Sequence, residues 1–417
     1  MDRASAWQWT EAWRRWWDGP DWQRTLVVLW VGEFLIAAGT NLVIPFLPLY
    51  IEQLGIHRLV DVERWSGVVF SSTFFLSALA QPIWGKLADR VGRKPMLIRS
   101  GLGMGLIMAS LGLVHNVWQL LILRALMGTV SGFIGAAIAL QASQTPRQEA
   151  GRALGTLQTG AVSGTLVGPL IGGVLSEWVG IRHCFFITGA AEVGAAVLVI
   201  FFVHERFAPD PKVAEMGLGA FVQELRRRKI VLPLFAVTLL IQMGYLSIEP
   251  IVTVYVHLLN PRSQHLATLA GATFAAIGVG NVISAPRLGR LADRIGAERV
   301  LWWSLVAAAC LYVPQAFVTS AYQLMGLRLA LGLALGGLQP SVQALIRRHT
   351  PTALLGRVYG FNASSMMVGN LIGPNLGGFV SAAYGIPMVF FSTAAVLGLD
   401  AIWVYRAVVA RASLSSS

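Results

Sequence analysis

The sequence predicts an all-α polytopic membrane protein whose twelve transmembrane helices form two pseudo-symmetric six-helix bundles. Two observations lead to this fold class: the chain is too apolar for a water-soluble protein, and its second half repeats motifs of its first. Of its 417 residues, 55% are hydrophobic and only 12% are charged, and the mean hydropathy is +0.63. A soluble domain carries about 25% charged residues, so most of the surface of this chain must face lipid.

Twelve apolar segments are candidates for spans, because about 20 helical residues cross the hydrocarbon core of a bilayer. Proline and glycine inside a segment are compatible with a membrane helix. The segments begin near Thr25, Trp65, Met96, Val117, Ala153, Arg182, Val231, Leu266, Arg299, Ala321, Leu355 and Ile386.

Polar stretches divide the chain into five parts. The longest polar connection follows the sixth segment and contains the sequences APDPK and RRRK. We expect an N-terminal segment at residues 1–24, a six-helix bundle at 25–203, a linker at 204–230, a second six-helix bundle at 231–408 and a tail at 409–417. The N-terminal segment has tryptophans at helical spacing, which predicts an interfacial amphipathic helix; a disordered tail is the alternative.

The formal net charge of +12 indicates membrane orientation and not nucleic acid binding. With both termini and the loops after spans 2, 4, 6, 8 and 10 on one side, that side holds 26 of the 32 basic residues (32 minus four on the other side and two within spans). Basic loops stay in the cytoplasm. We therefore expect a multi-pass protein of the plasma or inner membrane with both termini, the linker and the tail in the cytoplasm.

The two halves are related by an internal repeat. The sequence GKLADRVGRK at 85–94 returns as GRLADRIGAE at 289–298, 204 positions later (289 minus 85). QLLILRALMG at 119 returns at 323, GRALG at 151 returns as GRVYG at 356, and GPLIGG at 168 returns as GPNLGG at 373. Because the offset spans six helices, both halves have the same orientation, about an axis along the membrane normal.

These motifs resemble those of the major facilitator superfamily, and in particular its twelve-span drug:proton antiporter group. GKLADRVGRKPML matches the signature between spans 2 and 3, RALMG matches the span-4 arginine motif, and GAVSGTLVGPLIGG is similar to the span-5 signature of the antiporters. LVIPFLPLY in span 1 is also typical of that group. The resemblance covers nearly the whole chain, although Met127 stands where the span-4 motif often has a polar residue.

The resemblance implies a secondary active transporter that exports amphipathic small molecules in exchange for protons by alternating access. The alternative is an exporter or flippase of a lipid-like or physiological metabolite. The chain has no phosphate-binding loop and no HExxH or GxSxG motif, so neither an ATP-driven pump nor an enzyme is expected. The expected partners are small-molecule substrates, protons and the lipid bilayer, with no cofactor, no metal, no nucleic acid and a monomeric chain.

The repeated decamer is the predicted conformational latch. Its basic residues hold the loop in the cytoplasm, and by resemblance Asp89 and its arginines fasten the loop to the other half. The second copy keeps Asp293 and Arg294 but replaces a basic pair with Ala297 and Glu298, so we expect the first loop to be the stronger latch. The latch residues are Gly85, Asp89, Arg90, Gly92, Arg93, Lys94, Asp293 and Arg294.

Glycines four residues apart form a smooth face on spans 5 and 11. Small residues let membrane helices approach closely, and proline bends a helix. Close packing alone explains the pattern; the resemblance implies in addition that these spans slide at the interface between the halves. The motif comprises Gly160, Gly164, Gly168, Pro169, Gly172, Gly173, Gly373 and Pro374.

Acidic residues inside spans are the candidates for proton coupling, because a buried carboxylate is readily neutralised by a proton. The candidates are Glu33, Glu192 and Glu249, together with Arg124, whose motif the family links to coupling. A structural ion pair or hydrogen bond is the alternative for each of them. Asp400, near a helix end, is expected to be solvated.

Polar, aromatic and methionine side chains in spans 1, 5, 7 and 11 are the candidates for a substrate cavity. An apolar pocket with a few polar anchors suits amphipathic molecules, and flexible methionine favours promiscuous binding. Ordinary helix packing explains each residue singly. The candidates are Asn41, Phe46, Gln158, Gln242, Tyr245, Phe361, Asn362 and Met366.

Overall fold

The computed structural model describes residues 21–146, 148–205, 230–263, 265–350 and 354–409, and these residues form helices and short connections without a strand. Nine helical segments among them are long and apolar enough to cross a membrane. Three more, α5 (Arg93–Leu111), α14 (Ala297–Gln315) and α17 (Leu355–Tyr384), have the length but a more polar composition. Together they make the twelve predicted passes.

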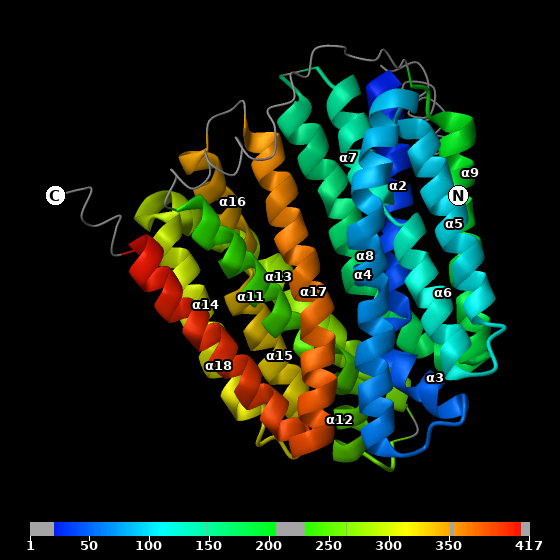
Figure 1. Cartoon of the computed structure of the whole chain (residues 1–417), viewed down its shortest axis with the longest axis vertical. Helices are drawn as coiled ribbons and strands as arrows, with labels where there is room; N and C mark the ends of the chain where they lie inside the picture. Colours follow the sequence, from blue (N-terminus) through cyan, green and yellow to red (C-terminus); the bar gives the residue numbers. More distant parts are fainter. Residues whose placement is uncertain (1–20, 147, 206–229, 264, 351–353, 410–417) are drawn as a thin grey trace, which may run out of the picture.

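The passes stand in two groups side by side, the first coloured blue to green and the second green to red (Figure 1). The first group is α2–η1–α3 (Asp21–Leu42, Ile44–Phe46, Leu47–Gln53), α4 (Leu59–Val91), α5, α6 with α7 (Val117–Val130, Phe133–Gln144), α8 (Ala150–Val179) and α9 (Ile181–Phe202). The second is α11–η2–α12 (Val231–Ser247, Glu249–Ile251, Val252–Leu259), α13 (Leu266–Ile295), α14, α15 with α16 (Ala321–Leu335, Leu338–His349), α17 and α18 with η4 (Ile386–Val404, Tyr405–Val409).

The predicted helix starts agree with these bounds, with the largest differences at the first two helices. α2 begins at Asp21 and α4 at Leu59, four and six residues before the apolar runs at Thr25 and Trp65. The helices are longer because charged residues occupy their end turns. The predicted N-terminal helix, most of the linker and the end of the tail lie outside the described residues.

Spans 1 and 7 are interrupted at the same place in each half. Pro45 lies in η1 between α2 and α3, and Pro250 lies in η2 between α11 and α12. Proline has no backbone N–H to donate and so breaks the helical ladder. The prolines are 205 residues apart (250 minus 45), in line with the repeat.

Glycines bring helix backbones into contact inside each half. The stripe on α8 consists of Gly160, Gly164, Gly168 and Gly172, and it faces α2. A Cβ atom at Gly164 would lie only 2.5 Å from the carbonyl oxygen of Phe34. In the second half, Gly369, Gly373 and Gly377 of α17 face α11 in the same way. The stripes therefore make close packing within the halves, the plainer of the two expectations for them, and do not lie between the halves.

Residues next to the stripes contact the opposite half. The carbonyl of Pro169 meets α13 at Gly271, and the carbonyl of Pro374 meets α4 at Gly67. A Cβ at Gly173 would lie 2.5 Å from the carbonyl oxygen of Ala267. These positions are turned about 100° from the stripe, because successive helical residues rotate by that angle.

The halves touch at one end of the molecule, which we term the closed end. There the Asn375 side chain donates a hydrogen bond to Ser71 (2.7 Å), and the Thr268 N–H donates to the Glu177 carboxylate (2.8 Å). At the opposite, open end of the same four helices, Cβ atoms at four glycines would meet no atom within 4 Å. These glycines are Gly85 on α4, Gly155 on α8, Gly289 on α13 and Gly360 on α17. The four interface helices therefore diverge towards the open end.

Asp400 is buried, and the prediction that it is solvated was wrong. The helix continues beyond Val404 through η4, so Asp400 lies nine residues before the last described helical position (409 minus 400). Its side chain is 0% exposed, and neither carboxylate oxygen has a hydrogen-bond partner. α18 packs against α11, α14 and α17 at this level of the bundle, which the position of Asp400 in the sequence does not reveal.

We predict that Gly164→Ala lowers the thermal stability of the purified protein in detergent, because overpacking costs about 1–3 kcal/mol. Gly194→Ala in α9 is the matched control: its Cβ would meet nothing within 4 Å, and alanine favours the helix by up to about 1 kcal/mol. Equal melting temperatures for the two variants would contradict the packing assigned to the stripe.

We also predict that Asp400→Leu raises the melting temperature. A buried polar group without a partner costs about 1–3 kcal/mol, and leucine removes that cost. Asp400→Asn retains the polar group and serves as the control, with no gain expected. A lower melting temperature for Asp400→Leu than for wild type would show that Asp400 makes a stabilising interaction.

Candidate functional site

Glu192 of α9 and Arg124 of α6 form a buried charged pair in the N-terminal half. Their exposed fractions are 0% and 4%, and each charge acts on the other. Neither carboxylate oxygen of Glu192 has a hydrogen bond, and two of the guanidinium nitrogens of Arg124 have none. The interaction is therefore electrostatic at longer range, and protonation of Glu192 would remove it without breaking a hydrogen bond.

Glu33 is a second buried acid in this half. Its side chain on α2 is 0% exposed, and both carboxylate oxygens are without a hydrogen-bond partner. Glu192 reaches the same helix at Gly39, where a Cβ would lie 3.0 Å from its Oε1. Six residues of helix separate Glu33 from Gly39, about 9 Å along the axis. Two buried acids therefore lie where α2 packs against α9: Glu192, which has Arg124 nearby, and Glu33, which has no described cation nearby.

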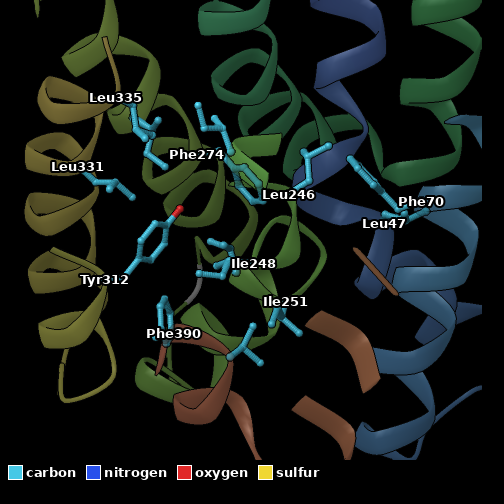
Figure 2. Packing of buried hydrophobic residues seen from close by; sticks show 14 of the residues in the cluster. Leu47, Phe70, Leu246, Ile248, Ile251, Phe274, Tyr312, Leu331, Leu335 and Phe390 are labelled. Carbon is cyan, nitrogen blue, oxygen red and sulfur yellow. The ribbon is translucent and has the colours of Figure 1, made fainter. Parts of the chain in front are cut away.

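The C-terminal half holds a larger polar cluster around the break in span 7. Glu249 lies in η2 and is 5% exposed, and its carboxylate accepts a hydrogen bond from the Tyr245 hydroxyl. The charge of Arg328 on α15 acts on both Glu249 and Tyr312 of α14. The Arg328 guanidinium is 0% exposed and lies 5.7 Å from the ring centroid of Phe274. Figure 2 shows the Tyr312 hydroxyl pointing into the bundle interior among these apolar side chains.

The two halves place equivalent arginines but non-equivalent acids. Arg124 and Arg328 are 204 residues apart and so match in the repeat (328 minus 124). Their acidic partners do not match: Glu192 lies on the last span of its half, whereas Glu249 lies on the first span of the other. The unpartnered acids reverse this placement, with Glu33 on span 1 and Asp400 on span 12. On the first and last spans of each half, one buried acid therefore lies near an arginine and one has no partner.

The predicted cavity residues are divided between accessible and buried positions. Gln158 on α8 is exposed, and Asn41, Gln242, Phe361 and Met366 are half-buried. Asn41 donates a hydrogen bond to the carbonyl of its own helix at Ala37 (2.8 Å) and lies 3.5 Å from the Thr165 hydroxyl of α8. Gln158 and Gln242 have no such fixed side-chain partner among the described contacts.

Phe46 is a core residue, which corrects its assignment to an accessible cavity wall. Its ring is 0% exposed and packs edge-on against Phe185 of α9, with the centroids 6.0 Å apart. Asn362 is 9% exposed and accepts a hydrogen bond from the Thr238 hydroxyl (2.8 Å), which joins α17 to α11. Tyr245 is half-buried, and its hydroxyl forms a hydrogen bond with Glu249.

The first copy of the decamer is held by an acid that sequence reasoning missed. Glu205, just after α9, accepts hydrogen bonds from the backbone N–H groups of Arg93 (2.9 Å) and Lys94 (2.7 Å). A carboxylate is favourable there because the first N–H groups of a helix have no partner within it. Gly92 joins α4 to α5 with φ +95°, and a Cβ there would lie 2.8 Å from Glu205. Glu205 lies at the start of the predicted linker, where no sequence motif could have indicated this contact.

The other latch residues lie at the open end. Arg90, Asp293 and Arg294 are exposed, Gly85 faces open space, and Lys94 Nζ donates to the carbonyl of Ile200 (3.0 Å). The side chain of Asp89 is outside the described part of the chain.

The second copy of the decamer has different contacts and is not simply degraded. Glu298, at the position of Lys94, is 7% exposed and forms an ion pair with Arg348 at the end of α16 (3.2 Å). Gly296 has φ +98° and plays the part of Gly92. Thus each copy has one carboxylate beside its glycine, from the residues that follow α9 in the first half and from α14 itself in the second.

The comparisons with known proteins point to one family. The model of the Major Facilitator Superfamily matches residues 29–279 and 259–416. The Multidrug resistance protein MdtG of Citrobacter koseri is 46% identical over 383 residues, which cover 92% of this chain and 94% of that protein. MdtG of Dickeya zeae is also 46% identical over 383 residues, with the same two coverages.

Solved structures share the fold at low sequence identity. A bacterial homologue of the human lysosomal transporter Spinster, in an inward-facing and unoccupied conformation, aligns over 93% of this chain and 97% of its own, with a TM-score of 0.77 and 14% identity. The nucleoside transporter NupG aligns over 92% and 98%, with a TM-score of 0.71 and 14% identity. With the family model matching both halves and relatives at 46% identity along almost the whole chain, this protein belongs to the Major Facilitator Superfamily.

Proposed function

We propose that this protein is a secondary active transporter that exports amphipathic small molecules in exchange for protons by alternating access. The observation that carries the proposal is the set of buried acids: Glu192 and Glu249 lie near arginines, and Glu33 and Asp400 have no partner. An acid in such a place is stable when protonated or when compensated by a cation. The name of the MdtG relatives supports a drug-like substrate.

In the inferred cycle, the negative charge of each paired acid is neutralised either by a bound proton or by the neighbouring arginine. When a proton binds Glu192 or Glu249, the acid loses its negative charge and no longer attracts Arg124 or Arg328. Loss of the proton restores the attraction. A conformation in which the acid is open to water on one side exchanges the proton there. Because equivalent arginines lie in both halves, the same exchange can act on either bundle. Glu33 and Asp400 are further coupling candidates.

We infer that the open end faces the cytoplasm, because the basic loops after spans 2 and 8 lie there and basic loops remain inside. The chain then has an inward-open arrangement, with residues 25–203 and 231–408 as the moving bundles and 204–230 as the cytoplasmic linker. Pro169, Gly173 and Pro374, with their partners at the closed end, form the contact that must open when the transporter faces outward.

The substrate is proposed to bind between the bundles, among the half-buried and exposed candidates of spans 1, 5, 7 and 11. Amide side chains without a fixed partner, such as Gln158 and Gln242, can bind many polar groups. Phe361 and Met366 supply apolar surface, which suits molecules of varied shape. The protein is proposed to act as a monomer in the plasma or inner membrane, without a cofactor, a metal or nucleic acid.

We predict that Glu33→Gln and Glu249→Gln each reduce efflux driven by a pH gradient at least tenfold, because an amide cannot carry the proton. The measurement is uptake of a fluorescent amphipathic dye into inside-out vesicles with an imposed acidic lumen, which corresponds to efflux from the cell. Asp400→Asn is tested in the same way. Asp61→Asn, in the first turn of α4 where the acid is 39% exposed and pairs with Arg58 outside the site, is the control and should transport as wild type does.

Normal transport in both glutamine variants would exclude these acids from coupling. Dye efflux that continues unchanged after the gradient is collapsed would exclude proton antiport itself. Transport of a lipid-like molecule in place of the dye would favour the alternative substrate class.

We further predict that Asp89→Asn impairs transport more than Asp293→Asn. The first decamer has Arg93 and Lys94 beside its acid, whereas the second has Ala297 and Glu298 in their places. Initial efflux rates at equal amounts of membrane protein provide the comparison. Equal loss in the two variants would contradict the ranking of the two loops.

A further inference from the structure

A separate cavity lies within the N-terminal half at the open end, between α4, α5 and α7. Its volume is about 330 Å³, close to the lower limit for ligand pockets. It is lined by Trp84 of α4, Arg93 and Arg99 of α5, and the residues at the start of α7, and none of the candidate coupling acids lines it. Gly85 and Arg93 of the predicted latch line this cavity, but neither the predicted substrate cavity nor the proposed proton exchange uses it.

The cavity exists because span 4 is broken. α6 ends at Val130 and α7 begins at Phe133, and Gly132 between them has φ +127°, which a residue with a side chain adopts only with strain. The break leaves backbone carbonyls without helical partners, at Thr129 and Ser131. From there α7 diverges from α4, which leaves α5 as the floor of the space between them.

Arg99 is held in place at this break. Its guanidinium lies 3.7 Å from the ring centroid of Trp84 and donates hydrogen bonds to the carbonyls of Thr129 (3.4 Å) and Ser131 (3.2 Å). The Trp84 indole N–H donates to the same Thr129 carbonyl (2.6 Å). Nε of Arg99 is buried and has no partner. The Trp84 ring and the two carbonyls therefore hold the Arg99 guanidinium in a fixed orientation.

Two arginines line the cavity, and the nearest described carboxylate, that of Glu205, accepts from the backbone N–H groups of Arg93 and Lys94 and not from their side chains. No described carboxylate forms an ion pair with Arg93 or Arg99, and no described residue of the lining is acidic. Guanidinium groups bind phosphate through paired N–H donors. A positive charge that is partly removed from water favours an anion over a cation.

The walls favour a ligand that is also partly apolar. Trp84 and Met96 provide most of the bulky apolar surface, and glycine and alanine on α7 keep the opposite wall smooth. A Cβ at Gly135 or at Gly85 would meet no atom within 4 Å. The glycines therefore leave room that a larger residue would occupy.

We propose that this cavity binds the phosphate head group of an amphipathic molecule, with Arg99 and Arg93 on the phosphate and Trp84 against its apolar part. The phosphate can belong to an anionic phospholipid of the adjacent leaflet or to a free alkyl phosphate. Binding here would join α4, α5 and α7 at the open end without using the coupling acids.

The test measures binding of dodecyl phosphate to the purified full-length protein in a neutral detergent by isothermal titration calorimetry. Gly135→Leu should fill the cavity and weaken binding at least tenfold. Gly194→Leu in α9, where a Cβ also meets nothing within 4 Å, should bind as wild type does. Arg93→Gln should also weaken binding, and dodecyltrimethylammonium should not compete.

Native mass spectrometry of the same variants distinguishes the two sources of phosphate. Phosphatidylglycerol or cardiolipin retained by wild type and by Gly194→Leu but lost from Gly135→Leu identifies a lipid head group. Dodecyl phosphate binding without a retained lipid identifies a free phosphate. Equal affinity of wild type and Gly135→Leu for dodecyl phosphate, or equal competition by the cationic amphiphile, would overturn the proposal.

Discussion

Backbone contact at glycine is the interaction on which the rest of this structure depends. Within a bilayer, burying apolar side chains does not drive helices together, so they associate where their backbones can approach closely. α8 lies on α2 and α17 lies on α11 through glycine stripes, and α4 and α13 meet α6 and α15 at Gly128 and Gly332. These contacts make each half a rigid body. Between the halves, the close contacts of the described glycines lie from the closed end to the middle of the interface helices, where Gly278 meets Leu166.

That arrangement explains how buried acids can be both costly and tolerated. The rigid halves enclose Glu33 and Asp400 without any polar partner, and they hold Glu192 and Glu249 within reach of arginines without a carboxylate–guanidinium hydrogen bond. A tight ion pair would resist protonation, whereas a looser one is easily exchanged for a proton. The geometry thus favours acids that gain and lose a proton. For stability alone, apolar side chains at these positions would cost less free energy.

The duplication preserved the scaffold and changed the polar groups placed on it. The arginines, the broken spans 1 and 7, and the glycines at helix contacts recur at offsets of 204 or 205. The acids do not recur at these offsets, and the acid near an arginine lies on the last span of the first half but on the first span of the second. The two copies of the decamer also differ in their polar contacts. Glu205 accepts a hydrogen bond from the first copy, whereas Glu298 of the second copy forms an ion pair with Arg348. Backbone packing tolerates few changes, whereas a charge can be compensated from any neighbouring helix.

The sequence by itself determined the fold class, the twelve helices and the repeat, because hydropathy and motif spacing are local properties that the bilayer converts directly into spans. It also indicated that Glu33, Glu192 and Glu249 are buried, but not that Asp400, Glu63 and Glu298 are. Only the tertiary structure decided which helix each residue faces. It turned the glycine stripe towards α2, placed Phe46 in the core, brought Glu205 to α5 and buried Asp400 without a partner. The reason is physical: a helix has several faces, and which face meets which neighbour depends on packing between segments that are distant in the chain.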